Sequence, residues 1–127
     1  MIIEINTQSS TTICDQLREQ IILGIAAKKL TPGEPLPSVR SLAADLGINY
    51  HTVNKAYSIL CDEGYIVIDR RKGAIVAQYV SGNENFLTRI SNTLLLASAE
   101  CVCRGMSEDE YIALCLDYYR KSRGGTL

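Results

Sequence analysis

Residues 30–64 constrain the fold most, because a short helical pattern and a longer one there are separated by a tight turn that begins at Gly47. The preceding stretch "LTPGEPLPS" (30–38) contains three prolines and a glycine, which excludes a helix. Ser38 is placed to cap a short helix, "VRSLAADL", and Gly47 to end it. A second helix is predicted over residues 49–63. A short helix, a tight turn and a second helix form the helix-turn-helix unit.

Further elements are predicted on both sides of this unit. After it, "YIVI" (65–68) and "AIVAQYV" (74–80) indicate two strands, joined by the turn "DRRKG" (69–73). Before it, apolar residues at every fourth position predict a helix over about residues 11–29, and "IIEI" (2–5) suggests a short strand. This order is that of a winged helix-turn-helix in which the hairpin is the wing.

The C-terminal part is predicted to be helical. Beyond the hinge "SGNEN" (81–85), apolar periodicity indicates helices at about 86–104 and 108–122. Ser107 and Glu110 have the S-x-x-E spacing of a capping box, which places the start of the last helix.

The two C-terminal helices carry apolar residues over more of their surface than one neighbouring helix can cover. The same pair from a second subunit would cover it, giving a two-fold homodimer, whereas the alternative is packing back onto the winged-helix body. The expected fold class is therefore mainly α with a small β-hairpin: a winged helix-turn-helix domain at 1–78 and a helical-pair dimerisation domain at 79–127. The residues expected at the dimer interface are Phe86, Leu87, Ile90, Leu94, Ala97, Tyr111, Ile112, Cys115 and Tyr119.

The second helix of the helix-turn-helix has one apolar face and one hydrogen-bonding face. The hydrogen-bonding face carries Tyr50, His51, Asn54, Lys55 and Ser58, and no carboxylate appears before Asp62. The start of such a helix meets base edges in the major groove of DNA. Asn54 can bind adenine bidentately, His51 can donate to or accept from a base edge, and Lys55 can reach guanine or a phosphate. A phosphate can also be held at the helix N-terminus by backbone N–H groups and the Thr52 hydroxyl. The alternative is an ordinary solvated face.

Basic side chains lie where the same duplex would pass. Arg40 is on the exposed side of the short helix, and Arg70, Arg71 and Lys72 are at the tip of the hairpin. A wing tip lies along the neighbouring minor groove, where such cations release counterions, although charged tips also serve solubility alone. The net charge is −1 and the pI about 5.8, so the basic footprint is local rather than general.

Residues 30–77, "LTPGEPLPSVRSLAADLGINYHTVNKAYSILCDEGYIVIDRRKGAIVA", resemble the signature of the GntR family of bacterial transcription regulators nearly end to end. The family pattern L-x-P-G-x-x-L-P-S-x-R-x-L-A-x-x-L-G-[IV] is met from Leu30 to Ile48. Its continuation T-V-x-x-A-[YL]-x-x-L-x-x-[ED]-G-[YL] is met from Thr52 to Tyr65. The N-terminus and the C-terminal helical pair are similar to the short YtrA-type branch, so the resemblance covers essentially the whole chain.

The resemblance implies a homodimeric winged-helix repressor that controls its own or a neighbouring transporter operon, and a dimer of this kind suits a palindromic operator. The family's DNA contacts correspond here to Arg40, Asn49, Tyr50, His51, Thr52, Asn54 and the wing residue Gly73. Longer branches often have an arginine at the helix start, where this chain has Tyr50 and Asn54. The operator sequence therefore does not follow from the resemblance.

Two other functions are alternatives. One is a thiol- or metal-responsive regulator using Cys101, Cys103 and Cys115, but helical residues two apart point about 200° from each other, and the single histidine is His51. The other is a winged-helix module that binds protein, for which an apolar or acidic helix face would be expected. An enzyme is not expected, since no phosphate loop, nucleophile motif or His–carboxylate pairing is present. Catalytic residues, cofactors and bound metals are accordingly not expected.

The expected location is the cytoplasm. The N-terminus lacks the basic start and apolar stretch of an export signal, and the longest aliphatic runs are too short to span a bilayer. The five cysteines are then expected to be free thiols. The expected partners are double-stranded DNA and a second copy of the chain, without a membrane. A small-molecule effector is compatible with the sequence, which identifies neither that effector nor the regulated genes.

Overall fold

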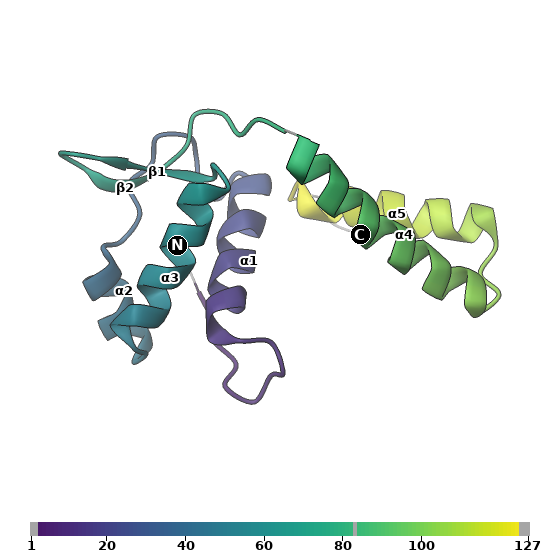
Figure 1. Cartoon of the computed structure of the whole chain (residues 1–127), viewed down its shortest axis with the longest axis horizontal. Helices are drawn as coiled ribbons and strands as arrows, with labels where there is room; N and C mark the ends of the chain where they lie inside the picture. The colour runs from purple at the N-terminus through teal and green to yellow at the C-terminus, as the bar shows by residue number, and fades with distance from the viewer. Residues whose placement is uncertain (1–2, 83, 125–127) are drawn as a thin grey trace. The chain divides into compact units, whose positions relative to one another are not determined.

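The computed structural model describes residues 3–82 and 84–124 (Figure 1). The chain forms two compact units that divide between Val80 and Ser81. The first unit contains three helices and a two-stranded hairpin, and the second contains two helices. The mainly helical fold with a small hairpin is as predicted.

Helix α1 (Ile13–Ala26) is shorter at both ends than the predicted 11–29. It begins after Thr12, whose side chain accepts a hydrogen bond from the amide of Asp15 at 3.1 Å. It ends early because Lys28 adopts a left-handed conformation, with φ of 61°. The carbonyl of Gly24 then accepts the amides of both Lys29 and Leu30, which closes the helix and turns the chain.

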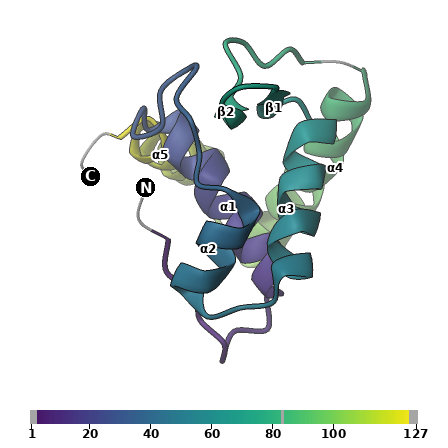
Figure 2. The ribbon, with the colours of Figure 1, turned by 90° about the vertical axis from the view of Figure 1, so that its left-hand side faces the viewer.

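Helices α2 (Val39–Leu46) and α3 (Tyr50–Asp62) form the predicted helix-turn-helix. Ser38 caps α2 by accepting the amide of Ser41 at 3.0 Å. Gly47 ends α2 at φ 66°, a left-handed conformation that a side chain disfavours. Helix α3 contacts α1, α2 and the hairpin, as Figure 2 shows from the side of α2 and α3.

Strands β1 (Ile66–Asp69) and β2 (Gly73–Val76) pair antiparallel, with Ile66 opposite Val76 and Asp69 opposite Gly73. The second strand was predicted to continue to residue 80 and does not. The amide of Ala77 still donates to the carbonyl of Tyr65, but the chain before Tyr65 is the end of α3, so no strand is available to pair with residues 78–80.

The segment before α1 was predicted to be a short strand, and residues 3–6 form none, while Ile2 lies outside the described residues. Two side chains of α1 hold this segment instead. The amide of Asn6 donates to Oε1 of Gln16 at 2.9 Å, and the amide of Glu4 donates to Oε1 of Gln20 at 3.0 Å. Glutamine side chains thus take the place of a neighbouring strand.

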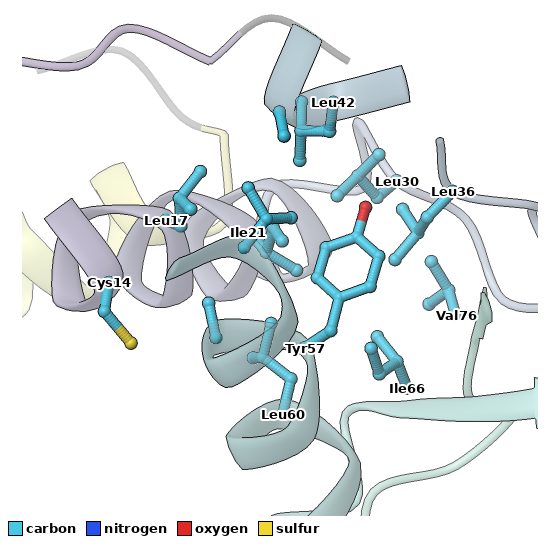
Figure 3. Packing of buried hydrophobic residues seen from close by; sticks show 13 residues of the cluster. Cys14, Leu17, Ile21, Leu30, Leu36, Leu42, Tyr57, Leu60, Ile66 and Val76 are labelled. Carbon is cyan, nitrogen blue, oxygen red and sulfur yellow. The ribbon is translucent and has the colours of Figure 1, made fainter. Parts of the chain in front are cut away.

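The core of the first unit lies between α1, α3 and the hairpin. Figure 3 shows the ring of Tyr57 within this cluster, with Ile21 on one side and Ile66 and Val76 on the other. The largest fully buried side chains among the described residues are Leu17, Ile21, Val53, Leu60, Ile66 and Val76. Each such side chain contributes roughly 1.5–3 kcal/mol to folding. The core therefore fixes the side of α3 that faces solvent.

The second unit consists of α4 (Glu84–Cys103) and α5 (Glu108–Ser122). The predicted capping box is present: Ser107 accepts the amide of Glu110 at 3.1 Å, and Glu110 accepts the amide of Ser107 at 3.2 Å. The hydroxyls of Ser98 and Tyr111 lie 2.6 Å apart and join the two helices. Neither helix contains a buried residue. Over the described ranges, the helices are all too short or too polar to cross a membrane.

Candidate nucleic-acid interface

Helix α3 exposes the hydrogen-bonding face that its sequence predicted. Val53, Ala56, Tyr57 and Leu60 are buried, and Cys61 is half-buried. On the other side Tyr50, His51, Asn54, Lys55 and Ser58 are exposed, with Thr52 half-buried between the two faces. The predicted face is thus open to solvent along its whole length.

Asn49, predicted as a DNA contact, also has a structural task. It is the N-cap of α3: its side-chain oxygen accepts the amide of His51 at 2.8 Å, and its backbone carbonyl accepts the amide of Thr52 at 3.1 Å. These amides were expected to be open to a phosphate. Because Asn49 occupies both, a phosphate held by the amides of His51 and Thr52 would have to displace the cap.

Arg40, Tyr50 and His51 form one cluster across the turn of the helix-turn-helix. The guanidinium carbon of Arg40 lies 5.5 Å from the centroid of the Tyr50 ring. The Tyr50 and His51 rings meet edge to face, with centroids 5.6 Å apart and planes at 84°. Arg40 and Tyr50 border an open depression of about 620 Å³ whose other lining residues are Ala43, Ala44, Gly47 and Ile48.

The hairpin tip is ordered by the carboxylate that precedes it. Asp69 accepts the amides of Arg71 at 2.7 Å and Lys72 at 2.9 Å. These hydrogen bonds, with that from Lys72 the larger contribution, lower the pKa of Asp69 below its ordinary value. Gly73 closes the turn at φ 75°, and the side chains of Arg70, Arg71 and Lys72 are exposed. The turn therefore displays three adjacent cations.

A second depression, of about 480 Å³, lies between α3 and the hairpin. Asn54 and Ser58 line it from α3, and Gly73 lines it from the wing, so the fold brings these predicted elements to one surface. Ile68 also lines it and is 68% exposed. Ile68 was predicted only as part of a strand, and its exposure beside Asn54 follows from how the hairpin packs against α3.

The cysteines considered for sensing lie in the second unit. Cys101 is half-buried, whereas Cys103 and Cys115 are exposed. Within residues 3–82 and 84–124, no three His, Cys, Asp or Glu side chains are grouped as metal ligands would be. In the first unit, burial raises the pKa of the Cys14 and Cys61 thiols, which disfavours their reactive thiolate forms.

The second unit has a broad exposed apolar surface. Among the residues predicted for dimerisation, Phe86, Ile90 and Tyr111 are partly buried, and Leu87, Leu94, Ala97, Ile112, Cys115 and Tyr119 are exposed. Leu95, Leu96 and Val102 add to this surface and are between 64% and 72% exposed. Exposed apolar areas of this size are typical of protein–protein interaction sites.

The family described as "Bacterial regulatory proteins, gntR family" matches residues 9–76. The pyridoxine biosynthesis transcriptional regulator PdxR of Corynebacterium glutamicum is 43% identical over 74 residues, which are 58% of this chain and 16% of that protein. The transcriptional repressor YtrA of Bacillus subtilis is 38% identical over 76 residues, 60% of this chain and 58% of that protein. The chain thus spans less than two thirds of the length of each of these relatives.

The solved structures that are similar to the chain include the following three. A protein described as a transcriptional antiterminator from Listeria monocytogenes EGD-e has a TM-score of 0.88 at 26% identity, over 100% of this chain and 96% of that one. YtrA from Sulfolobus acidocaldarius, a GntR-family transcription factor, has a TM-score of 0.62 at 42% identity, over 76% and 99%. AraR(DBD) in complex with operator ORX1 has a TM-score of 0.51 at 25% identity, over 59% and 96%.

Proposed function

The chain belongs to the GntR family of bacterial regulatory proteins, and we propose that it is a sequence-specific DNA-binding regulator of transcription of the YtrA type. The proposal rests above all on the carboxylate-free, exposed start of α3, which lies in one compact unit with a wing tip of three cations. The similarity to AraR(DBD), whose structure contains an operator, supports this reading.

In this proposal α3 is the recognition helix. Asn54 and His51 bind base edges in the major groove, and Lys55 binds guanine or a phosphate. Thr52 and Asn49 support the start of the helix, and Asn49 does so as the cap already described. The depression between α3 and the hairpin places Asn54 on the same surface as the wing residue Gly73.

Arg40 and the wing provide the electrostatic part of binding. Arg40 and Tyr50 lie at the turn between α2 and α3, where the DNA backbone would pass. Arg70, Arg71 and Lys72 extend from the hairpin toward the neighbouring minor groove, where each phosphate neutralised releases counterions. The net charge of −1 means that the chain as a whole does not attract the duplex, so the attraction depends on local groups of cations such as these.

The second unit is proposed to be the dimerisation domain, with the division of the chain near residues 78–80 separating it from the DNA-binding domain. Its apolar residues are exposed in the single chain, and a second copy would cover them. Two recognition helices related by a two-fold axis would bind a palindromic operator with half-sites about one helical turn apart.

The regulator is proposed to act in the bacterial cytoplasm as a repressor of its own or a neighbouring transporter operon. The name of the Bacillus subtilis relative, a transcriptional repressor, supports the direction of regulation. Bound to a promoter, a dimer would block polymerase, and a small-molecule effector, which nothing in the chain identifies, would release it.

Fluorescence anisotropy with duplex DNA from upstream of the protein's own gene tests this function. We expect the wild type to prefer that duplex over a random one, and Asn54→Ala to lose about 1–3 kcal/mol of the preference. Arg40→Ala should weaken binding to both duplexes. Lys29→Ala is the matched control, because Lys29 is an exposed cation at the end of α1, outside the proposed interface. Equal, weak binding of the wild type to every duplex tested would contradict the proposal.

A further inference from the structure

We propose that Tyr50 acts on DNA binding through Arg40: its ring holds the guanidinium at the edge of the recognition surface, so Tyr50 is a positioning residue. The proposal rests on the DNA-binding function proposed above. Within that function, Tyr50 positions Arg40, and the alternative is that the Tyr50 side chain contacts base edges itself.

The geometry places the two side chains on either side of the turn. Arg40 is the second residue of α2 and Tyr50 the first residue of α3. The 5.5 Å between the guanidinium carbon and the ring centroid is within the range of a cation–π contact. Within the described ranges, the Arg40 side chain makes no hydrogen bond or ion pair, so the Tyr50 ring is what restrains it.

The ring is itself restrained. Tyr50 is 41% exposed, and its ring meets that of His51 edge to face. Because Tyr50 begins α3 directly after the Asn49 cap, its backbone is fixed by the start of the helix. The guanidinium therefore lies against a surface whose position the helix-turn-helix determines.

The contact with the ring leaves the binding capacity of Arg40 intact. Within the described ranges the N–H donors of its guanidinium have no hydrogen-bond acceptor, so they are available to a phosphate or a guanine. An exposed arginine without a partner would lose rotamer freedom on binding, which weakens the affinity. Holding Arg40 before DNA arrives reduces that loss.

The surface beside the pair has room for a strand of the duplex. Ala43, Ala44 and Gly47 line the depression that Arg40 and Tyr50 border. These are small residues, so a sugar–phosphate backbone can approach α2 closely while Arg40 binds it from the rim.

A double-mutant cycle on the operator duplex tests the proposal, using Arg40→Ala, Tyr50→Ala and the double variant in the full-length protein. We expect Tyr50→Ala to weaken binding several-fold in the wild-type background and less than twofold in the Arg40→Ala background, a coupling of about fivefold. Tyr50→Phe, which keeps the ring, should bind within twofold of the wild type. The dependence of binding on salt should decrease in Tyr50→Ala as it does in Arg40→Ala.

Two results would overturn the proposal. If Tyr50→Ala weakens binding equally with and without Arg40, Tyr50 is a separate DNA contact. If Tyr50→Phe binds as weakly as Tyr50→Ala, the effect of Tyr50 comes from its hydroxyl and not from its ring. Unchanged thermal unfolding of each variant serves as the folding control. If Tyr50→Ala unfolds early, Tyr50→Leu takes its place in the cycle. Failure of the wild type to prefer the operator would instead contradict the DNA-binding function, and that comparison is made first.

Discussion

The hydroxyl of Tyr57 donates a hydrogen bond to the backbone carbonyl of Pro37, 2.8 Å away. Tyr57 is on the buried side of α3, and Pro37 directly precedes the cap of α2. This bond therefore links the proposed recognition helix to the turn that starts the helix carrying Arg40. The ring is 4% exposed, so the hydroxyl satisfies its hydrogen-bonding need through Pro37 rather than through solvent.

Replacing Tyr57 by phenylalanine should lower the free energy of unfolding of the first unit by about 1 kcal/mol, because the carbonyl of Pro37 loses its buried donor. Urea denaturation followed by circular dichroism measures the change. Tyr79→Phe is the control, since Tyr79 is 80% exposed and should leave stability unchanged. An equal effect of the two substitutions would mean that the bond to Pro37 contributes nothing.

Tyr57 should also make the protein less stable in alkali. Burial raises the pKa of Tyr57 to about 12, whereas an unfolded tyrosine ionises near about 10. The stability contribution is complete below about pH 10 and decreases as the pH rises toward about 12, by up to about 1.4 kcal/mol per pH unit. The free energy of unfolding, measured from pH 9 to 11.5, should therefore decrease more steeply with pH for the wild type than for Tyr57→Phe. Parallel curves would show that Tyr57 is not the group responsible.

The ion pair between Arg18 and Glu63 should stabilise the contact of α1 with the end of α3. It is bidentate, with Nε to Oε1 at 2.6 Å and Nη2 to Oε2 at 2.8 Å, and both side chains are mostly buried. A double-mutant cycle with Arg18→Met and Glu63→Gln should give a coupling of about 1 kcal/mol in urea denaturation. The pair would be energetically unimportant if the two single effects simply added.

The wing cations should govern the salt dependence of DNA binding more than its sequence preference. Arg71→Gln is expected to reduce the slope of log affinity against log salt by about one on operator and random duplexes alike. Anisotropy titrations at several salt concentrations measure the slope, and Lys29→Gln provides the matched loss of one charge elsewhere. A change in sequence preference with an unchanged slope would place Arg71 at a base edge instead.

Leu94 should be needed for dimerisation. It is 52% exposed in the single chain, and burying a glutamate there against an apolar partner surface would be strongly unfavourable. Sedimentation equilibrium should show a dimer for the wild type and a weaker or absent dimer for Leu94→Glu. Leu94→Met is the control, because it keeps an apolar side chain of similar volume at the same position. Dimers of equal strength in both variants would exclude Leu94 from the interface.

The sequence alone determined the elements whose signals lie within a few residues. The bounds of α2 were predicted without error, because Ser38 and Gly47 act on adjacent backbone groups. The capping box of Ser107 and Glu110 places α5 for the same reason. The period of apolar residues on α3 gave its buried face and therefore the exposed face that carries the proposed site, whose role in DNA binding stays a prediction.

Only the tertiary structure decided features that join residues far apart in the chain. Strand β2 ends at Val76, because the chain before Tyr65 belongs to the end of α3 and cannot pair with it as a strand. The segment before α1 is held by Gln16 and Gln20. The pairs Arg18–Glu63 and Arg40–Tyr50 likewise depend on how two helices pack. A helix cap or an apolar face of a helix depends on residues within a few positions of each other, and the sequence gives these directly. A contact across the core depends on the packing of every element between its two residues, and that packing exists only in the folded unit.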